Sequence, residues 1–224
     1  MPERSRPLLL GHRGARAATE IPENTLASFD LCLEHGCDGF EFDVRRTADG
    51  TPIICHDAIF RGVLLAQASA RDLAVWQAQG LLPKLEHVLQ RYADRCFLDI
   101  EIKDAGLEHR VVELLRRFPP VRGYVVSSFL PVVLLRLREL DAAVELGFLW
   151  DQLTTPWHAL PVQWLLPECR LLDATLAAES SAAGKRIGTW TVNQPVDVLR
   201  LRALGAEMLI SDDTAGLVNT FPVI

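Results

Sequence analysis

Short apolar runs alternate with amphipathic stretches along this 224-residue chain, and this alternation restricts the fold more than any other sequence feature. The apolar runs predict strands at 7–11, 37–46, 96–102, 122–127, 144–149, 169–173, 186–192 and 206–211, with a hairpin arm at 52–55. The stretches between them predict helices at 24–35, 84–92, 107–117, 131–140, 175–183, 195–204 and 214–220. Regular alternation of strands and helices is typical of a parallel α/β fold.

Eight strand–helix units of about 28 residues each fit a (β/α)₈ TIM barrel near its lower size limit of about 200 residues. A doubly wound open sheet is the alternative. The chain contains no GxGxxG or Walker A loop, so nucleotide-binding versions of the open sheet lose support. We see no linker or low-complexity tract and predict a single domain over residues 1–224. Residues 57–83 are the least regular segment and interrupt the alternation.

Charge and hydropathy exclude several classes of protein. The chain has 23 Lys and Arg against 29 Asp and Glu, a net charge of −6, whereas nucleic-acid binding requires a basic face. The longest apolar run, residues 129–135, is far shorter than the roughly 18 residues of a membrane span. The three leucines near the N-terminus are too few for a secretory signal. The five cysteines form no CxxC pair, so we expect free thiols and a cytoplasmic location; the oligomeric state is left open.

A barrel enzyme keeps its site at the carboxyl ends of the strands, and polar residues gather at those positions here. The residues at or just beyond the predicted strand ends are His12, Arg13, Glu41, Asp43, Asp99, Glu101, Lys103, Ser127, Ser128, Asp173, Trp190, Asn193, Ser211 and Asp212. The sequence therefore predicts a polar site at one end of the barrel.

Carboxylates are the main chemical signal in this set. Glu41 and Asp43 are two residues apart in a strand, so they point to the same face, and Glu101 stands in the next barrel strand. Adjacent carboxylates repel each other unless a cation or a shared proton lies between them. Three carboxylates without cysteine favour a hard ion, Mg²⁺ or Ca²⁺. The pattern is equally compatible with carboxylates that are solvated rim residues, or that pair with Arg45, Arg46 and Lys103.

Two histidines differ from the other four because each directly follows an apolar strand. His12 and His56 are candidates for general acid and base, since the ordinary pKa of histidine is near neutral. Arg13 and Lys103 could bind a phosphate, or they could pair with the carboxylates. Trp190 is either a core aromatic or part of a pocket. Together with a divalent ion, these residues are suited to phosphate-ester chemistry.

Several motifs resemble the glycerophosphodiester phosphodiesterase family. The first 57 residues are the most specific part, with Gly11-His12-Arg13-Gly14, Pro22-Glu23-Asn24-Thr25, Glu41-Phe42-Asp43-Val44 and His56-Asp57. The later motifs follow in the family's order, with Glu101-Ile102-Lys103, Ser127-Ser128-Phe129, Trp190-Thr191-Val192-Asn193 and Ile210-Ser211-Asp212. The resemblance covers nearly the whole chain.

The resemblance implies a (β/α)₈ barrel that hydrolyses glycerophosphodiesters to glycerol 3-phosphate and an alcohol. It implies that Glu41, Asp43 and Glu101 bind one divalent cation, Mg²⁺ or Ca²⁺. It also implies that His12 and His56 are the catalytic acid–base pair. In related enzymes a glycerol hydroxyl of the substrate is thought to attack phosphorus, giving a cyclic phosphate that water then opens.

The resemblance further implies residues that bind or surround the substrate. Arg13 and Lys103 would hold the phosphate, and Trp190 would line the substrate pocket. Glu23 and Asn24 match a motif that shapes the site and would have a supporting role.

The chain departs from the family's pattern after the His-Asp pair. Residues 58–83 form a shortened insertion that lacks the usual Thr- and Gly-rich stretch, which leaves the alcohol group unassigned. Lys84 stands where a small hydroxyl residue is common, and Asp173 where a histidine or another polar residue is expected. Asp99 replaces a frequent asparagine and adds a fourth carboxylate near the ion.

Two other functions stay open at this stage. A lysophospholipase D would need an exposed apolar lip to meet a membrane. The candidates for it are Trp76, Trp150, Trp157 and Trp164, although we expect these tryptophans to pack against helices instead. A catalytically silent binding protein is the third possibility, and the intact set of histidines and carboxylates argues against it.

Overall fold

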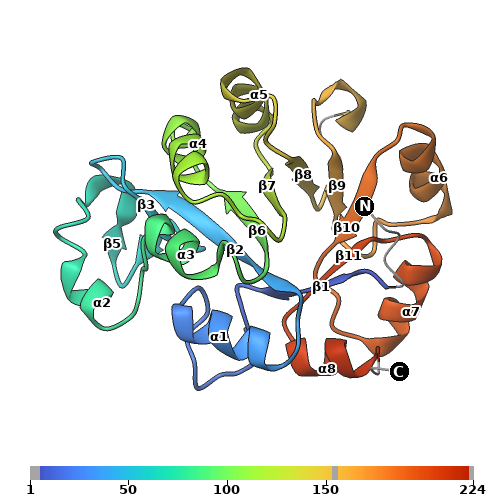
Figure 1. The fold of residues 1–224 in the computed structure, drawn as a ribbon, viewed down its shortest axis with the longest axis horizontal. Coiled ribbons are helices and arrows are strands. Elements are labelled where there is room, and N and C mark those ends of the chain that lie inside the picture. Colours follow the sequence, from blue (N-terminus) through green and yellow to red (C-terminus); the bar gives the residue numbers. More distant parts are fainter. Residues whose placement is uncertain (1–5, 153–155, 222–224) are drawn as a thin grey trace.

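A computed structural model describes residues 6–152 and 156–221, which form a closed barrel of parallel strands with helices around it (Figure 1). In order around the barrel the strands are β1 (Leu8–His12), β2 (Gly39–Arg46), β6 (Phe97–Ile102), β7 (Tyr124–Ser128), β8 (Leu146–Trp150), β9 (Trp164–Pro167), β10 (Arg186–Thr189) and β11 (Met208–Ser211). The barrel closes because β1 pairs in parallel with both β2 and β11. The predicted (β/α)₈ TIM barrel is confirmed.

Each of the seven predicted helices is present, on the outside of the barrel. They are α1 (Leu26–Glu34), α3 (Leu85–Tyr92), α4 (Glu108–Arg117), α5 (Pro131–Leu140), α6 (Ala174–Ala182), α7 (Pro195–Ala203) and α8 (Thr214–Asn219). Local sequence explains their ends. Thr25 caps α1 by accepting a hydrogen bond from the Ser28 backbone N–H, and α5 and α7 begin with a proline, whose missing N–H costs nothing in the first turn. Gly36 follows α1 with a φ of +93°, a conformation that glycine adopts without strain.

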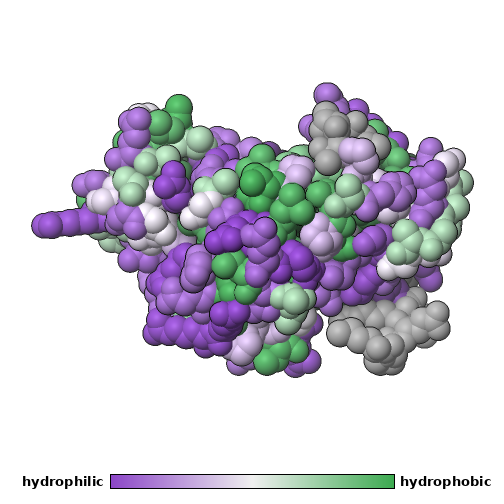
Figure 2. All heavy atoms as spheres, turned by 90° about the horizontal axis from the view of Figure 1, so that it is seen from above, coloured by the Kyte–Doolittle hydropathy of each residue, from purple (hydrophilic) through white to green (hydrophobic). Residues whose placement is uncertain are grey.

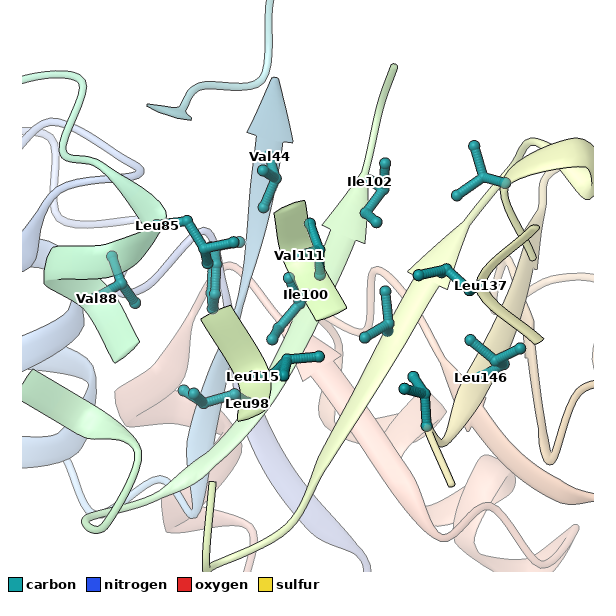
Figure 3. Close-up of a cluster of buried hydrophobic side chains, with 14 of the residues drawn as sticks. Val44, Leu85, Val88, Leu98, Ile100, Ile102, Val111, Leu115, Leu137 and Leu146 are labelled. Carbon is teal, nitrogen blue, oxygen red and sulfur yellow. The ribbon is translucent and has the colours of Figure 1, made fainter. Parts of the chain in front are cut away.

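Alternation along the strands divides the side chains between two hydrophobic layers. In β6, Leu98, Ile100 and Ile102 face outward, and Figure 3 shows them in one hydrophobic cluster with Val111 and Leu115 of α4. Phe97 belongs to a separate cluster inside the barrel with side chains from β1, β7, β8, β9 and β11. Since side chains alternate between the two faces of a strand, Asp99 and Glu101 must point into the barrel with Phe97. The apolar floor therefore lies toward the amino end of the strands, and polar side chains lie above it.

One predicted strand is wrong. The sixth barrel strand is β9, whose four residues are all buried, whereas residues 169–173 form a turn that leads into α6. In that turn Leu171 is 38% exposed. The carboxylate of Asp173 accepts a hydrogen bond from the Leu176 backbone N–H at 2.8 Å and caps the helix. The apolar Leu-Leu pair before Asp173 therefore belongs to a helix entry rather than to a strand.

The segment between the hairpin arm and α3 is folded. The arm is β3 (Pro52–Ile54), which pairs antiparallel with β2 as predicted. It is followed by a two-stranded hairpin, β4 (Ile59–Phe60) and β5 (Val63–Leu64), a 3₁₀ turn η1 (Leu65–Gln67) and a short helix α2 (Ala74–Ala78). A small hydrophobic cluster holds it together, formed by Ile53, Cys55, Leu65, Ala68, Leu73 and Leu82. This segment interrupts the strand–helix alternation, as expected, but it has regular structure and a core of its own.

The face of the molecule seen from above is mainly hydrophilic (Figure 2). Figure 2 shows polar residues over most of one face, with hydrophobic residues gathered toward its middle. Three of the four tryptophans considered as a lipid-facing lip are buried, Trp150, Trp157 and Trp164. A 3₁₀ turn, η2 (Trp157–Ala159), contains one of them. Among the described residues, no helix has both the length and the apolar character needed to cross a bilayer.

Candidate active site

Three buried carboxylates meet at the carboxyl end of two neighbouring strands. Glu41 and Asp43 come from β2 and Glu101 from β6, and the strand register places Asp43 beside Glu101. One oxygen of each carboxylate lies within 4.8 Å of the others. All three side chains are buried, so they are not solvated rim residues. Glu41 Oε1 has no hydrogen-bond partner among the described residues, which is unusual for a buried oxygen. The group therefore fits a hard cation that oxygen ligands prefer.

The electrostatics of the three carboxyls support this fit. Burial raises the pKa of Glu41 well above its ordinary value, and the neighbouring Asp43 and Glu101 add to the effect. Burial and Asp43 likewise raise the pKa of Glu101 to about 8. Burial alone would also raise the pKa of Asp43, but Lys103 and Arg13 keep it below the ordinary value. Closely spaced acidic groups of this kind take up either protons or a cation.

A fourth carboxyl lies on the same inward face of β6. Asp99 is fully buried, and its Oδ1 accepts a hydrogen bond from the Ser127 hydroxyl at 2.6 Å. Asp99 Oδ2 has no hydrogen-bond partner among the described residues. Burial raises the pKa of Asp99 to about 7. The extra carboxyl noted in the sequence is therefore inside the barrel, next to the acidic group but outside the set of three that lie close enough to share an ion.

Two cations contact the acidic group. Lys103 Nζ lies 2.6 Å from Glu101 and 3.0 Å from Asp43, while Arg13 Nε lies 3.3 Å from Asp43. Arg45, considered as another partner for these carboxylates, pairs with Asp104 instead. Lys103 and Arg13 also line the cavity above the carboxylates. They can therefore face an anion from the cavity while they pair with the carboxylates.

Both candidate histidines reach the same cavity, and each has a carboxylate behind it. His12 Nδ1 lies 2.7 Å from Asp212 Oδ1, and its Nε2 lies 4.0 Å from Glu41. His56 Nδ1 lies 2.8 Å from Asp57 Oδ1. Since a carboxylate only accepts hydrogen bonds, the Nδ1 atoms carry the protons and the Nε2 atoms are the free ring nitrogens. Burial lowers the pKa of His56, an effect that Asp43 and Asp57 partly oppose.

The cavity has a volume of about 330 Å³ and two chemically different sides. Strands β1, β2 and β6 carry its charged side, together with His56 from the loop after β3. The rest of the lining comes from the ends of β7, β8, β10 and β11 and is apolar apart from Asp151; its other members are Phe129, Leu149, Trp190 and Ile210. Trp190 is held by a hydrogen bond from its Nε1 to the Leu166 carbonyl at 2.9 Å and by an edge contact with Phe129. Trp190 is thus both anchored and part of the pocket wall.

Glu23 and Asn24 lie behind the charged side. Asn24 Nδ2 donates a hydrogen bond to Asp43 Oδ2 at 2.8 Å, and Asn24 Oδ1 accepts one from the Asp43 backbone N–H at 3.2 Å. Glu23 accepts a hydrogen bond from Arg13 at 2.8 Å. Asn24 and Arg13 both have left-handed backbone, with φ values of +57° and +56°, and the Arg13 backbone N–H donates to Glu41 Oε2. Such strained conformations persist where the surrounding contacts fix them.

Sequence reasoning placed Asp212 at a strand end but gave it no role. In the structure it accepts hydrogen bonds from His12, from Asn193 at 2.9 Å and from Arg16 at 3.0 Å. Burial alone would raise the pKa of Asp212, but the bonds from His12 and Asn193 hold it far below its ordinary value. Asp151 in the cavity wall was also missed. Strand-end position was the available signal for both residues, but it does not show which side chains they contact.

A closed parallel barrel with an acidic cluster, two carboxylate-backed histidines and two cations at the carboxyl ends of its strands defines the class of TIM-barrel proteins with a site for an anionic ligand. The particular family follows from sequence. The profile of the glycerophosphoryl diester phosphodiesterase family matches residues 12–215, and the chain belongs to this family.

Relatives of known name agree with this assignment. The chain is 53% identical to the probable glycerophosphodiester phosphodiesterase 1 of Mycobacterium tuberculosis, over 89% of this chain and 86% of that protein. It is 26% identical to a glycerophosphodiester phosphodiesterase of Caldanaerobacter subterraneus, over 95% and 96% of the two chains. Among solved structures, an Oleispira antarctica phosphodiesterase in complex with the product sn-glycerol-3-phosphate superimposes with a TM-score of 0.82, at 25% identity and 96% coverage of both chains.

Proposed function

We propose that this protein hydrolyses glycerophosphodiesters to sn-glycerol 3-phosphate and an alcohol. The observation that carries the proposal is the convergence of the acidic cluster, His12, His56, Arg13 and Lys103 on one cavity. Family membership supports the reaction class, and the product bound to the Oleispira relative supports sn-glycerol 3-phosphate as the product here.

Glu41, Asp43 and Glu101 are the residues that would hold one divalent cation, Mg²⁺ or Ca²⁺. Oxygen ligands serve both ions, and the unpaired Glu41 Oε1 is a free ligand atom. When bound, the cation would neutralise charge on the phosphate oxygens. Arg13 and Lys103 add two further positive charges from the protein, and Arg can hold two phosphate oxygens at once.

His12 and His56 are proposed as the acid–base pair. One imidazole, unprotonated at Nε2, removes the proton from the attacking hydroxyl while the hydroxyl oxygen forms a bond to phosphorus. The other, protonated at Nε2, gives its proton to the alcohol oxygen as the bond between that oxygen and phosphorus breaks. If the attacking hydroxyl is the glycerol hydroxyl of the substrate, the first product is a cyclic phosphate. Water then opens it, with the two histidines in exchanged roles.

Trp190 would form the wall against the carbon skeleton of the substrate, opposite the charged side. Glu23 and Asn24 would support Arg13 and Asp43. We favour small glycerophosphodiesters over phospholipids as substrates, because three of the tryptophans that could have formed a lipid-facing lip are buried. We also propose one domain over residues 1–224, with residues 58–83 as a shortened insertion, and a cytoplasmic location, with which the five buried free cysteines are consistent.

A release assay tests the proposal. Purified protein would be incubated with glycerophosphocholine, -ethanolamine, -glycerol and -inositol in Mg²⁺ or Ca²⁺, and sn-glycerol 3-phosphate would be measured. We expect release from at least one diester, and detergent-dispersed lysophospholipid to react more slowly. Absence of release from all four diesters with both ions contradicts the proposal, and faster cleavage of lysophospholipid would assign the site to a lysophospholipase D.

A further inference from the structure

One arginine outside the cavity connects the carboxylates behind His12 and Arg13. Arg16 Nε lies 2.7 Å from Glu23 Oε2, and its Nη1 lies 3.0 Å from Asp212 Oδ1. The two carboxylates come from distant parts of the chain, the loop before α1 and the end of β11. Arg16 therefore ties two separate segments of the barrel mouth together.

Besides its bond to Arg16, each of these carboxylates accepts a hydrogen bond from a candidate site residue. Glu23 Oε1 accepts from Arg13 Nη1 at 2.8 Å, and Asp212 Oδ1 lies 2.7 Å from His12 Nδ1. The result is a continuous series of alternating basic and acidic side chains, His12–Asp212–Arg16–Glu23–Arg13. Its two ends enter the cavity, but Arg16 in the middle is not among the cavity-lining residues of the described structure.

We infer that Arg16 is a positioning residue for the reaction proposed above, on which this inference rests. By holding Asp212 and Glu23 at fixed places, it sets the orientation of the His12 imidazole and of the Arg13 guanidinium. The His12 orientation matters because an Nδ1–H bound to Asp212 leaves Nε2 toward Glu41 and the cavity, where it exchanges a proton with the substrate.

The contacts of Asp212 show why Arg16 contributes beyond Asn193. The amide of Asn193 donates to Asp212 Oδ2 and its carbonyl accepts from the Asp212 backbone N–H, so one carboxylate oxygen is held without Arg16. Oδ1 is the oxygen that His12 uses, and Arg16 is the second donor to it. On the other side, Glu23 is 36% exposed as a side chain, and Arg16 and Arg13 together hold both of its oxygens.

The exposed location of Arg16 also predicts that it contributes little to the stability of the fold. Its side chain is 40% exposed, and exposed ion pairs contribute little to folding. Removal of Arg16 should therefore leave the fold stable, while the His12 imidazole and the Arg13 guanidinium are no longer held in a fixed orientation. Small displacements of reacting groups reduce rates strongly, which makes turnover the sensitive quantity.

The test compares Arg16→Ala and Arg16→Lys with Arg136→Ala, a matched control that removes an exposed arginine paired with Glu139 at 2.7 Å on α5. We expect Arg16→Ala to lower kcat on the best glycerophosphodiester about 10- to 100-fold. Arg16→Lys should recover part of that loss, Arg136→Ala should match wild type, and all variants should have similar Tm values.

Proton NMR gives a readout that does not need turnover. The His12 Nδ1–H held by Asp212 should give a downfield signal, assigned by its loss in Asp212→Asn, and exchange with solvent should be faster in Arg16→Ala than in Arg136→Ala. A normal kcat together with unchanged exchange in Arg16→Ala overturns the inference. If wild type cleaves no glycerophosphodiester, the proposed function fails, and the exchange measurement still decides whether Arg16 positions His12.

Discussion

Asn24 holds Asp43 through both ends of its side-chain amide, with hydrogen bonds of 2.8 Å to the carboxylate and 3.2 Å from the backbone N–H. Groups that orient a metal ligand in this way commonly change metal affinity or activity 10- to 100-fold when removed. The pair therefore links the loop before α1 directly to the acidic cluster.

Asn24→Ala should weaken divalent-ion binding by about 10- to 100-fold while the protein stays folded. Without the Asn24 amide the Asp43 carboxylate is no longer held in one orientation. The ion must then order the carboxylate when it binds, which weakens binding. Titration calorimetry with Mg²⁺ or Ca²⁺ measures the change. Asn219→Ala, at an exposed position at the end of α8, is the control and should bind the ion as wild type does. Equal affinity in both variants would remove Asn24 from the site.

Activity should depend on a divalent ion and on Glu41. Glu41→Ala removes both the ligand oxygen without a partner and the acceptor for the Arg13 backbone N–H, so we expect no measurable turnover with an intact fold. Excess chelator should have the same effect on wild type, and added Mg²⁺ or Ca²⁺ should reverse it. Circular dichroism checks the fold of the variant. Full wild-type activity in chelator would rule out the metal-dependent reaction.

His12→Ala and His56→Ala should each lower kcat about 10²- to 10⁴-fold, the usual contribution of general acid–base catalysis. His109→Ala, at an exposed position on α4, serves as the matched control and should retain the wild-type rate. Steady-state kinetics with the best substrate from the release assay measures all three. A near-normal kcat in either cavity variant would exclude that histidine from proton transfer.

The ion-free protein should lose stability as the pH rises from about 5 to about 8. Asp99 and Glu101 have pKa values raised by burial to about 7 and about 8, above their ordinary values of 3.8 and 4.5. Between the ordinary and the raised values the folded state binds protons that the unfolded state has already lost, so folding becomes less favourable as the pH rises. Asp212, with a lowered pKa, acts in the opposite direction, but only in more acidic solution.

Thermal unfolding in chelator at several pH values measures this effect. Asp99→Asn replaces the carboxyl by a neutral amide and should make the decline in Tm smaller. His56 has a lowered pKa and therefore makes stability rise with pH, opposite to Asp99. Both proteins contain His56, so its contribution cancels when the variant is compared with wild type. A saturating divalent ion should also flatten the wild-type curve, because the ion replaces protons at the carboxylates. Identical pH profiles for Asp99→Asn and wild type would contradict the assignment.

Much of the fold was predictable because its elements have clear local periodicity. The helix expected at 131–140 has those bounds, and the two-residue spacing in β2 correctly placed Glu41 and Asp43 on one face. The error at 169–173 arose because the Leu171-Leu172 pair resembles a short apolar strand, whereas in the turn Leu172 is buried and Leu171 is exposed. The true strand, β9, has only four residues and no alternation, since all four are buried.

Within the site, sequence reasoning found residues that stand at strand ends but not the contacts between them. Asp212 was noted by position, yet its bond to His12 joins residues 200 apart in the sequence. Arg16 carries no strand-end signal, since it lies within the loop between β1 and α1. Glu23 lies in the same loop, and Asp212 meets Arg16 only when the end of β11 comes beside this loop. Such contacts follow from barrel closure, which local patterns do not contain.

The pairing of β1 with both β2 and β11 has a consequence for the order in which the site is built. The ribosome makes Glu41, Asp43 and Glu101 well before it makes Asp212. A nascent chain therefore holds every carboxylate of the acidic cluster long before His12 can meet its partner. The His12–Asp212 pair requires β11 to lie beside β1, so the proposed acid–base residue His12 gains its carboxylate partner only when the barrel closes.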